Sequence, residues 1–273
     1  MEITSFSNPR IKQLRKLQDK KERIRSGLYY IEGLRIIGDA LQHQAAFDSV
    51  YYAPELLRSE FGHGLLQQLE QKGIPVFSVS AAIFEHFAAK DHPQGIAAVM
   101  KMQENPLPAV DIAKRQIWVG LDEIADPGNL GTILRTQDAT NGAGLFLLGN
   151  CTDAYDHAVL RASMGAFFTQ PISSLSPKDM NHWKQKNGVM VIGASDAAKV
   201  DYQSYQYPVR MVLLMGSERQ GLHPEPAALC DEIVSIPMAG YADSLNLSVA
   251  TAVILYEIFN QHRRAGLIPG GKQ

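Results

Sequence analysis

Cysteine is scarce in this chain of 273 residues, which contains only Cys151 and Cys230. Two cysteines can form neither a disulfide framework nor a four-ligand zinc site, so we expect a reducing compartment and no bound metal. Long hydrophobic runs are also missing, since no apolar stretch approaches the ~18 residues that span a bilayer. The first residues, MEITSFSNPRIKQLRK, lack the apolar core of a signal peptide. We therefore expect a cytoplasmic protein that does not interact with membranes.

The chain also lacks a large net charge, which is −2, and its 45% hydrophobic and 20% charged residues are typical of a globular protein. The charges are unevenly spread. The segment 10–25 has a net charge of +6, so the remainder carries −8. Such a segment is either a solvated helix face or an anchor for a polyanion, because neutralising phosphates releases counterions. Its basic residues are Arg10, Lys12, Arg15, Lys16, Lys20, Lys21, Arg23 and Arg25.

A helix is predicted at the start of this basic segment. Ile11, Leu14 and Leu17 recur every third residue, which gives one apolar stripe that packs inward and leaves most of the cations outside. Asn8 is expected to cap the helix, and Pro9 fits its first turn.

Residues 27–103 alternate short apolar runs with helical patterns, which predicts a small α/β domain. The predicted strands are 28–31, 49–52, 76–79 and 96–99, and the predicted helices are 34–43, 55–72 and 81–89. Two prolines follow in a short polar stretch, Pro106 and Pro108. We therefore predict an N-terminal domain over 1–103 and a linker over 104–112.

A second alternation fills the predicted C-terminal domain, 113–273. Its strands are nearly continuous apolar runs, which predict a parallel sheet covered on both faces. In such sheets ligands bind at the loops that leave the carboxyl ends of the strands. The predicted strands are 117–121, 145–148, 189–192, 211–214 and 233–236, and the predicted helices are 130–140, 178–186 and 247–262.

Three segments that follow predicted strands have unusual composition. In 126–136, Asn129 occupies the position of a helix cap, and we expect the six-residue spacing to place Arg135 near the same face. In 213–222, an apolar strand runs into Gly216, where the backbone can approach a ligand closely, and then Glu218. In 236–250, Ser244 and Asn246 precede a long apolar helix, although one cap would suffice.

Together these segments resemble the three motifs of the SpoU/TrmH-type RNA ribose methyltransferases of the SPOUT superfamily. The matching stretches are NLGTILRT (129–136), LLMGSERQGL (213–222) and IPMAGYADSLNLSVA (236–250). The N-terminal part is similar to this family's substrate-binding domain at 5–12, 30–33 and 92–96. The resemblance thus covers nearly the whole chain. Arg219 departs from it, because the family usually has a small or acidic residue there.

The resemblance implies S-adenosyl-L-methionine as cofactor, held by the backbone at Gly216, Ile236, Met238 and Leu245. It also implies a trefoil knot threaded by the C-terminal segment and a homodimer whose active site uses both chains. The substrate would be RNA, with ribosomal RNA favoured by the separate N-terminal domain. Candidate RNA contacts are Arg10, Lys12, Arg15, Lys16 and Lys20.

The family's functional positions carry over to Asn129, Arg135, Glu218, Ser244 and Asn246. The implied reaction is attack by a ribose 2′-hydroxyl on a sulfonium methyl group. The family's proposals make the arginine a base, but a guanidinium with a pKa of ~12.5 would cost roughly 7.5 kcal/mol to deprotonate at pH 7. We therefore favour Arg135 as a clamp on the hydroxyl and the adjacent phosphate, and leave assistance by a base open.

Other functions remain open from the sequence. A transfer-RNA ribose methyltransferase would have the same motifs. A non-catalytic RNA-binding protein would explain the basic helix but not three motifs at strand ends. A Rossmann-type nucleotide enzyme would explain the alternation, but Gly128-Asn129-Leu130-Gly131 does not match G-x-G-x-x-G.

Overall fold

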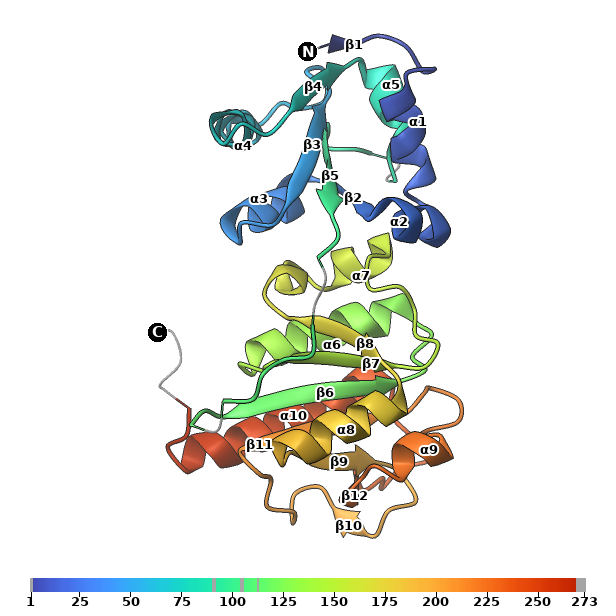
Figure 1. Ribbon diagram of the computed structural model, residues 1–273, viewed down its shortest axis with the longest axis vertical. Helices are drawn as coiled ribbons and strands as arrows, with labels where there is room; N and C mark the ends of the chain where they lie inside the picture. The colour runs from blue at the N-terminus through green and yellow to red at the C-terminus, as the bar shows by residue number, and fades with distance from the viewer. Residues whose placement is uncertain (1, 90–91, 104–105, 112, 269–273) are drawn as a thin grey trace. The chain divides into compact units, whose positions relative to one another are not determined.

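The computed structural model describes residues 2–89, 92–103, 106–111 and 113–268 (Figure 1). Contacts divide the chain into two compact units, Met1–Glu104 with Tyr155–Phe168, and Asn105–Ala154 with Thr169–Gln273. The segment Tyr155–Phe168 thus packs with the first unit, although it lies within the range predicted for the C-terminal domain. Residues 104, 105 and 112 of the predicted linker lie outside the described residues.

The first unit is an α/β structure with a mixed sheet. Among its described residues the sheet has five strands in the order β1-β4-β3-β5-β2; β5 is antiparallel to β2 and β3, and the other pairs are parallel. The strands are β1 (Glu2–Ile3), β2 (Leu28–Glu32), β3 (Phe47–Tyr52), β4 (Val76–Val79) and β5 (Ile96–Lys101). The helices are α1 (Pro9–Lys16), α2 (Lys20–Ser26), α3 (Leu34–Gln42), α4 (Glu60–Gln71), α5 (Ala81–Phe87) and α7 (His157–Ala162), with a 3₁₀ turn at Ala166–Phe168.

The predicted strands and helices of this unit are confirmed, with two boundary corrections. Helix α4 begins at Glu60 rather than at residue 55, because the Ser59 side chain accepts a hydrogen bond from the Gly62 N–H at 3.1 Å and caps the helix there. The basic segment forms two helices, since α1 ends at Lys16 and Asp19 caps α2. Neither β1 nor α7 was predicted.

The second unit contains the predicted parallel sheet. Its seven described strands have the order β10-β12-β9-β11-β6-β7-β8, and every described pair is parallel. The strands are β6 (Gln116–Asp122), β7 (Gly144–Leu148), β8 (Ile172–Leu175), β9 (Met190–Ala194), β10 (Val200–Asp201), β11 (Arg210–Met215) and β12 (Glu232–Ser235). The helices are α6 (Pro127–Ala139), α8 (Pro177–Asn187), α9 (Pro224–Ala227) and α10 (Leu247–Arg264). The short strands β8 and β10 were not predicted.

Both faces of this sheet are covered, as the apolar strands predicted. Trp118 and Val212 point to the face where Met180 and Trp183 of α8 complete a buried cluster. Helices α6 and α10 pack against each other and against the other face (Figure 1). Because successive side chains of a strand alternate between faces, a strand buried on both sides must be apolar throughout.

The strand order places the reversal of the chain between β6 and β11. From β6 the chain proceeds to β7 and β8 on one side, whereas β9, β12 and β10 lie on the other side. Ligands of parallel α/β sheets bind outside the carboxyl ends of the strands at such a reversal. The loops that follow β6, β9, β11 and β12 are therefore where a site is expected.

Candidate active site

Three predicted side chains form a hydrogen-bonded chain across these loops. Asn129 Nδ2 donates to Glu218 Oε1 at 2.9 Å, and Asn246 Nδ2 donates to Asn129 Oδ1 at 3.0 Å. Asn129 is 8% exposed, and a buried amide needs hydrogen-bond partners for both its nitrogen and its oxygen. Glu218 and Asn246 are those partners. The segments after β6, β11 and β12 are thereby fixed to one another through side chains.

Asp126 rather than Asn129 caps helix α6, which corrects the expectation from the sequence. The helix begins at Pro127, and Asp126 Oδ1 accepts a hydrogen bond from the Asn129 N–H at 2.7 Å. Since Asp126 satisfies the orphan backbone donor, the side chain of Asn129 is free to link Glu218 and Asn246.

Asn246 caps α10 and also holds the site together. Its Oδ1 accepts hydrogen bonds from the backbone N–H groups of Ser248 and Val249 at 2.9 and 3.3 Å, while its Nδ2 donates to Asn129. Ser244 is exposed and forms no hydrogen bond with any residue that the structure describes. Of the two candidate caps, Asn246 is therefore the one used.

The segment Ser217–Gly221 forms a closed loop at the end of β11. Ser217 N donates to Gly221 O at 2.9 Å, and Gly221 N donates to Ser217 O at 3.0 Å. Gly216 is buried behind this loop, and a Cβ atom on it would overlap the backbone of Gly221 and Leu222. The close approach seen at Gly216 is thus to the chain's own backbone, and the close approach of a ligand there stays a prediction.

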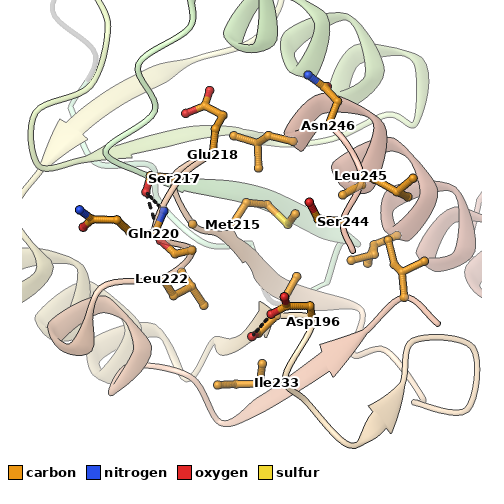
Figure 2. Close-up of a pocket in the computed structure, with 18 of the residues that line it drawn as sticks. Asp196, Met215, Ser217, Glu218, Gln220, Leu222, Ile233, Ser244, Leu245 and Asn246 are labelled. Carbon is orange, nitrogen blue, oxygen red and sulfur yellow. Dashed lines mark hydrogen bonds between the residues drawn. The ribbon is translucent and has the colours of Figure 1, made fainter. Parts of the chain in front are cut away.

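A cavity of about 680 Å³ opens beside this loop (Figure 2). Figure 2 shows Glu218 and Asn246 on one side of it, Asp196 and Ile233 on the other, and Met215 between them. The four residues predicted to hold a cofactor all line the cavity, namely Gly216, Ile236, Met238 and Leu245. Its size is within the range of small-molecule sites, and the mixture of apolar walls with a few polar groups is typical of them.

Arg135 lies apart from the cavity of its own chain. It is exposed on α6, lines no part of the cavity, and forms no hydrogen bond or ion pair with a described residue. The expectation that Asn129 and Arg135 share a face is wrong, since Asn129 is buried and Arg135 is exposed. Six residues rotate a helix by about 240° beyond one full turn, which separates the two side chains.

Sequence reasoning missed two polar features of the site. Asp196 follows β9 and lines the cavity, a position that the rule about strand ends could have identified. His223 follows the loop and reaches Asp122 at the end of β6, with 2.9 Å between His223 Nδ1 and Asp122 Oδ2. This hydrogen bond, together with the charge of the carboxylate, raises the pKa of His223. No local pattern links residues so distant in the sequence.

The predicted RNA-contacting residues lie on the first unit. Asn8 caps α1 as expected, with 2.9 Å between Asn8 Oδ1 and the Arg10 N–H, and Ile11, Leu14 and Leu17 are buried. All five candidates are exposed, namely Arg10, Lys12, Arg15, Lys16 and Lys20.

Arg23 differs from the other cations of the basic segment. It is buried, and its Nη1 donates to the carbonyl oxygens of Leu17 and Gln18 at 2.8 and 2.9 Å. It therefore joins α1 to α2 instead of presenting its charge to solvent. In the described part of the chain no helix is both long enough and apolar enough to cross a membrane.

Comparison with known families gives two matches along the chain. Residues 116–256 match the SpoU rRNA Methylase family, and residues 8–98 match the MRM3-like substrate binding domain. The first match covers all seven described strands of the second unit's sheet and all three motif segments, and it ends within α10.

Individual relatives match over nearly their full length. The chain is 31% identical to an uncharacterized tRNA/rRNA methyltransferase of Synechocystis sp. over 265 residues, which cover 95% of this chain and 93% of that protein. It is 30% identical to the 23S rRNA (guanosine(2553)-2′-O)-methyltransferase RlmP of Bacillus subtilis, with 94% and 98% covered.

A solved structure is similar throughout. The AdoMet-bound rRNA methyltransferase from Sinorhizobium meliloti superposes with a TM-score of 0.86 at 34% identity, covering 97% of this chain and 98% of that one.

Proposed function

This chain belongs to the SpoU rRNA methylase family, and from that premise we propose that it transfers a methyl group from S-adenosylmethionine to a ribose 2′-hydroxyl of ribosomal RNA. The observation that carries the proposal is the cavity at the ends of β9, β11 and β12, which Gly216, Ile236, Met238 and Leu245 line together. The relatives' rRNA substrates favour a cytoplasmic location.

The cavity fits this cofactor in size and chemistry. Met215, Leu222 and Ile233 provide apolar surface of the kind on which an adenine packs, and exposed backbone of the loop 236–245 provides donors and acceptors. Asp196 and Asp243 add carboxylates, which suit hydroxyl groups and a cationic ligand. When bound, S-adenosylmethionine supplies a methyl group on a positively charged sulfur.

We assign Asn129, Glu218 and Asn246 the task of holding the loops in one arrangement. Glu218 Oε1 accepts from Asn129, and its Oε2 lies 3.5 Å from the Ala125 N–H, so that both carboxylate oxygens face donors of the segment after β6. Fixing these loops before the substrate arrives lowers the entropy cost of reaching the reactive geometry. Ser244, which lines the cavity beside Asn246, is left to contact cofactor or substrate.

Arg135 is assigned the role of a cationic clamp on the RNA. Deprotonating an ordinary guanidinium would cost roughly 7.5 kcal/mol at pH 7, which disfavours its use as a base. A planar cation with several N–H donors can instead hold the 2′-hydroxyl oxygen and a neighbouring phosphate together as negative charge develops on the oxygen.

A homodimer would bring Arg135 to a cavity. Val249 and Tyr256 leave apolar surface exposed on α10, at 47% and 46%, and α10 packs against α6, which carries Arg135. If a second copy covers this surface, Arg135 of one chain reaches the cavity of the other, which explains why it lies apart from its own. We also propose the family's knot, with α10 as the segment that is threaded after β12.

We further propose that residues 1–103 form a domain that binds the RNA and that residues 113–273 form the methyltransferase domain. Residues 104–112 are the linker between them. The match of residues 8–98 to a substrate binding domain and the exposed cations Arg10, Lys12, Arg15, Lys16 and Lys20 support this division.

Methylation of defined RNAs tests the function. The chain should transfer a labelled methyl group from S-adenosylmethionine to a 23S rRNA transcript. The phosphodiester bond that follows the labelled nucleotide should resist alkaline hydrolysis, because the 2′-hydroxyl that would attack it is blocked. Transfer RNA and a transcript with a single 2′-deoxy nucleotide at the mapped position serve as controls. Binding of rRNA without any methyl transfer would instead identify a non-catalytic RNA-binding protein.

A further inference from the structure

His223 joins the end of β6 to the loop that forms one wall of the cavity. Asp122, the last residue of β6, is 3% exposed. Its Oδ2 accepts two hydrogen bonds from His223, one from the backbone N–H at 2.8 Å and one from Nδ1 at 2.9 Å. His223 is thereby anchored to the sheet by both its backbone and its ring.

The other ring nitrogen faces the loop. His223 Nε2 lies 2.9 Å from Gln220 Oε1 and 3.6 Å from Glu123 Oε2. Oxygen acceptors thus lie beside both ring nitrogens, and only the doubly protonated ring can donate to both sides at once. The charged groups that face the ring are Asp122 from β6 and Glu123 from the turn after it, and both are acidic.

Gln220 belongs to the closed loop Ser217–Gly221. Its backbone N–H donates to Ser217 Oγ at 3.3 Å, and both residues line the cavity. Figure 2 marks this hydrogen bond with a dashed line. Glu218 of the same loop bonds to Asn129. A contact that fixes Gln220 therefore also helps to fix the loop that forms one wall of the cavity. The same contact helps to position the carboxylate of Glu218, which bonds to Asn129.

We propose that His223 is a positioning residue for cofactor binding, whose imidazolium form ties the loop Ser217–Gly221 to the end of β6 and thereby shapes the cavity for S-adenosylmethionine. The inference rests on the proposed function in that the cavity takes this cofactor. Loss of the proton leaves one N–H for two acceptor sides, so the tie to the loop weakens and binding weakens with rising pH.

Calorimetry with S-adenosylmethionine between pH 6 and 9 tests the proposal on the full chain. His223→Gln and His223→Asn should each weaken binding at pH 6 by about tenfold, the scale of one charge-assisted hydrogen bond. The affinity of these variants should also lack the weakening with rising pH that loss of the His223 proton causes in the wild type. His182→Gln, an exposed histidine on α8 outside the cavity, is the matched control and should keep the wild-type profile. Titration of the cofactor's own amino group is common to all variants and cancels in the comparison.

A second variant leaves the His223 side chain itself unchanged. Glu123→Gln keeps the Asp122 hydrogen bond but removes one negative charge from beside Nε2, so the midpoint of the affinity profile should move to lower pH. An unmoved midpoint, or His223 variants that bind as the wild type does, would overturn the inference and leave the proposed function intact. A wild-type chain that binds no S-adenosylmethionine at any pH overturns the proposed function, and the inference with it.

Discussion

At the scale of single residues, Arg135 presents the sharpest contrast with its neighbours. Asn129, Glu218 and Asn246 satisfy one another, whereas Arg135 is exposed and forms no ion pair with a described residue. A cation without a structural partner can be changed at little cost in stability, because surface substitutions rarely alter it by more than about 0.5 kcal/mol. Its replacement therefore reports on function more cleanly than replacement of the asparagines.

Replacing Arg135 should abolish chemistry but spare cofactor binding. Arg135→Ala loses charge and donors, and Arg135→Lys keeps the charge but cannot reproduce a planar fork of N–H groups. Both should bind S-adenosylmethionine almost normally, while the single-turnover rate on rRNA at saturating cofactor falls more than tenfold. An Arg135→Ala enzyme that keeps over a tenth of the rate would have lost under ~1.4 kcal/mol, too little for a central group.

At the scale of elements, the helices α1 and α2 offer a test of the role of charge in RNA binding. Replacing Lys12, Arg15, Lys16 and Lys20 with alanine removes four exposed cations. RNA affinity should fall, and the slope of log affinity against log salt should become shallower by up to ~0.7 per lost contact with single-stranded RNA. The matched control removes four exposed lysines elsewhere, Lys72, Lys101, Lys178 and Lys186. If the slope of log affinity against log salt is the same for both variants, the cations of α1 and α2 face solvent and do not contact RNA.

The end of α10 gives a prediction about pH and stability. His262 is 3% exposed, its Nδ1 accepts from Arg115 Nε at 2.9 Å, and its Nε2 lies 3.0 Å from Tyr207 O. Burial, together with the charge of Arg115, lowers the pKa of His262, although the hydrogen bond to Tyr207 opposes the shift. The unfolded chain therefore binds the proton more readily than the folded one.

The stability from this histidine should be complete above about pH 6.5 and fall as pH decreases below it, because the folded pKa is the lower of the two. Denaturant unfolding at several pH values should show a smaller loss toward pH 5 for His262→Gln than for the wild type. His182→Gln should behave as the wild type, since that side chain is exposed. A variant slope equal to the wild-type slope contradicts the assignment.

Most of the longer strands and helices followed from local patterns, whereas the short strands β1, β8 and β10, the helix α7 and the arrangement of the elements did not. Apolar runs identified β6, β9, β11 and β12, and the polar loops after them contained most of the site. The order of these strands, which makes β11 the neighbour of β6, is a property of long-range pairing. The hydrogen bond between Asp122 and His223 joins the end of β6 to the segment after β11. It depends on the pairing of these two strands, so no spacing in the sequence could reveal it.

At the scale of the whole molecule, the separation of Arg135 from its own cavity predicts shared active sites. An Arg135→Ala chain has an intact cavity, and a Ser244→Trp chain has an intact arginine but an obstructed cavity. Neither should be active alone. Mixed under conditions of subunit exchange, they should recover about a quarter of wild-type activity, because half the dimers are mixed and each has one complete site.

If activity does not recover on mixing, Arg135 acts in the active site of its own chain. The control is a mixture of the Arg135→Ala chain with a chain that carries both substitutions, in which no dimer has a complete site. Subunit exchange itself is followed by mass spectrometry of differently tagged chains, so that a failure to exchange is recognised before activity is compared.

Asn246 is both the cap of α10 and the hydrogen-bond donor to Asn129. The first turn of a helix is the part that frays most readily, and here fraying would withdraw the amide on which the hydrogen-bonded chain to Glu218 depends. We therefore expect this hydrogen-bonded chain to be lost whenever the first turn of α10 frays. Because Asn246 and Leu247 line the cavity, we expect a ligand bound there to increase the order of the start of α10.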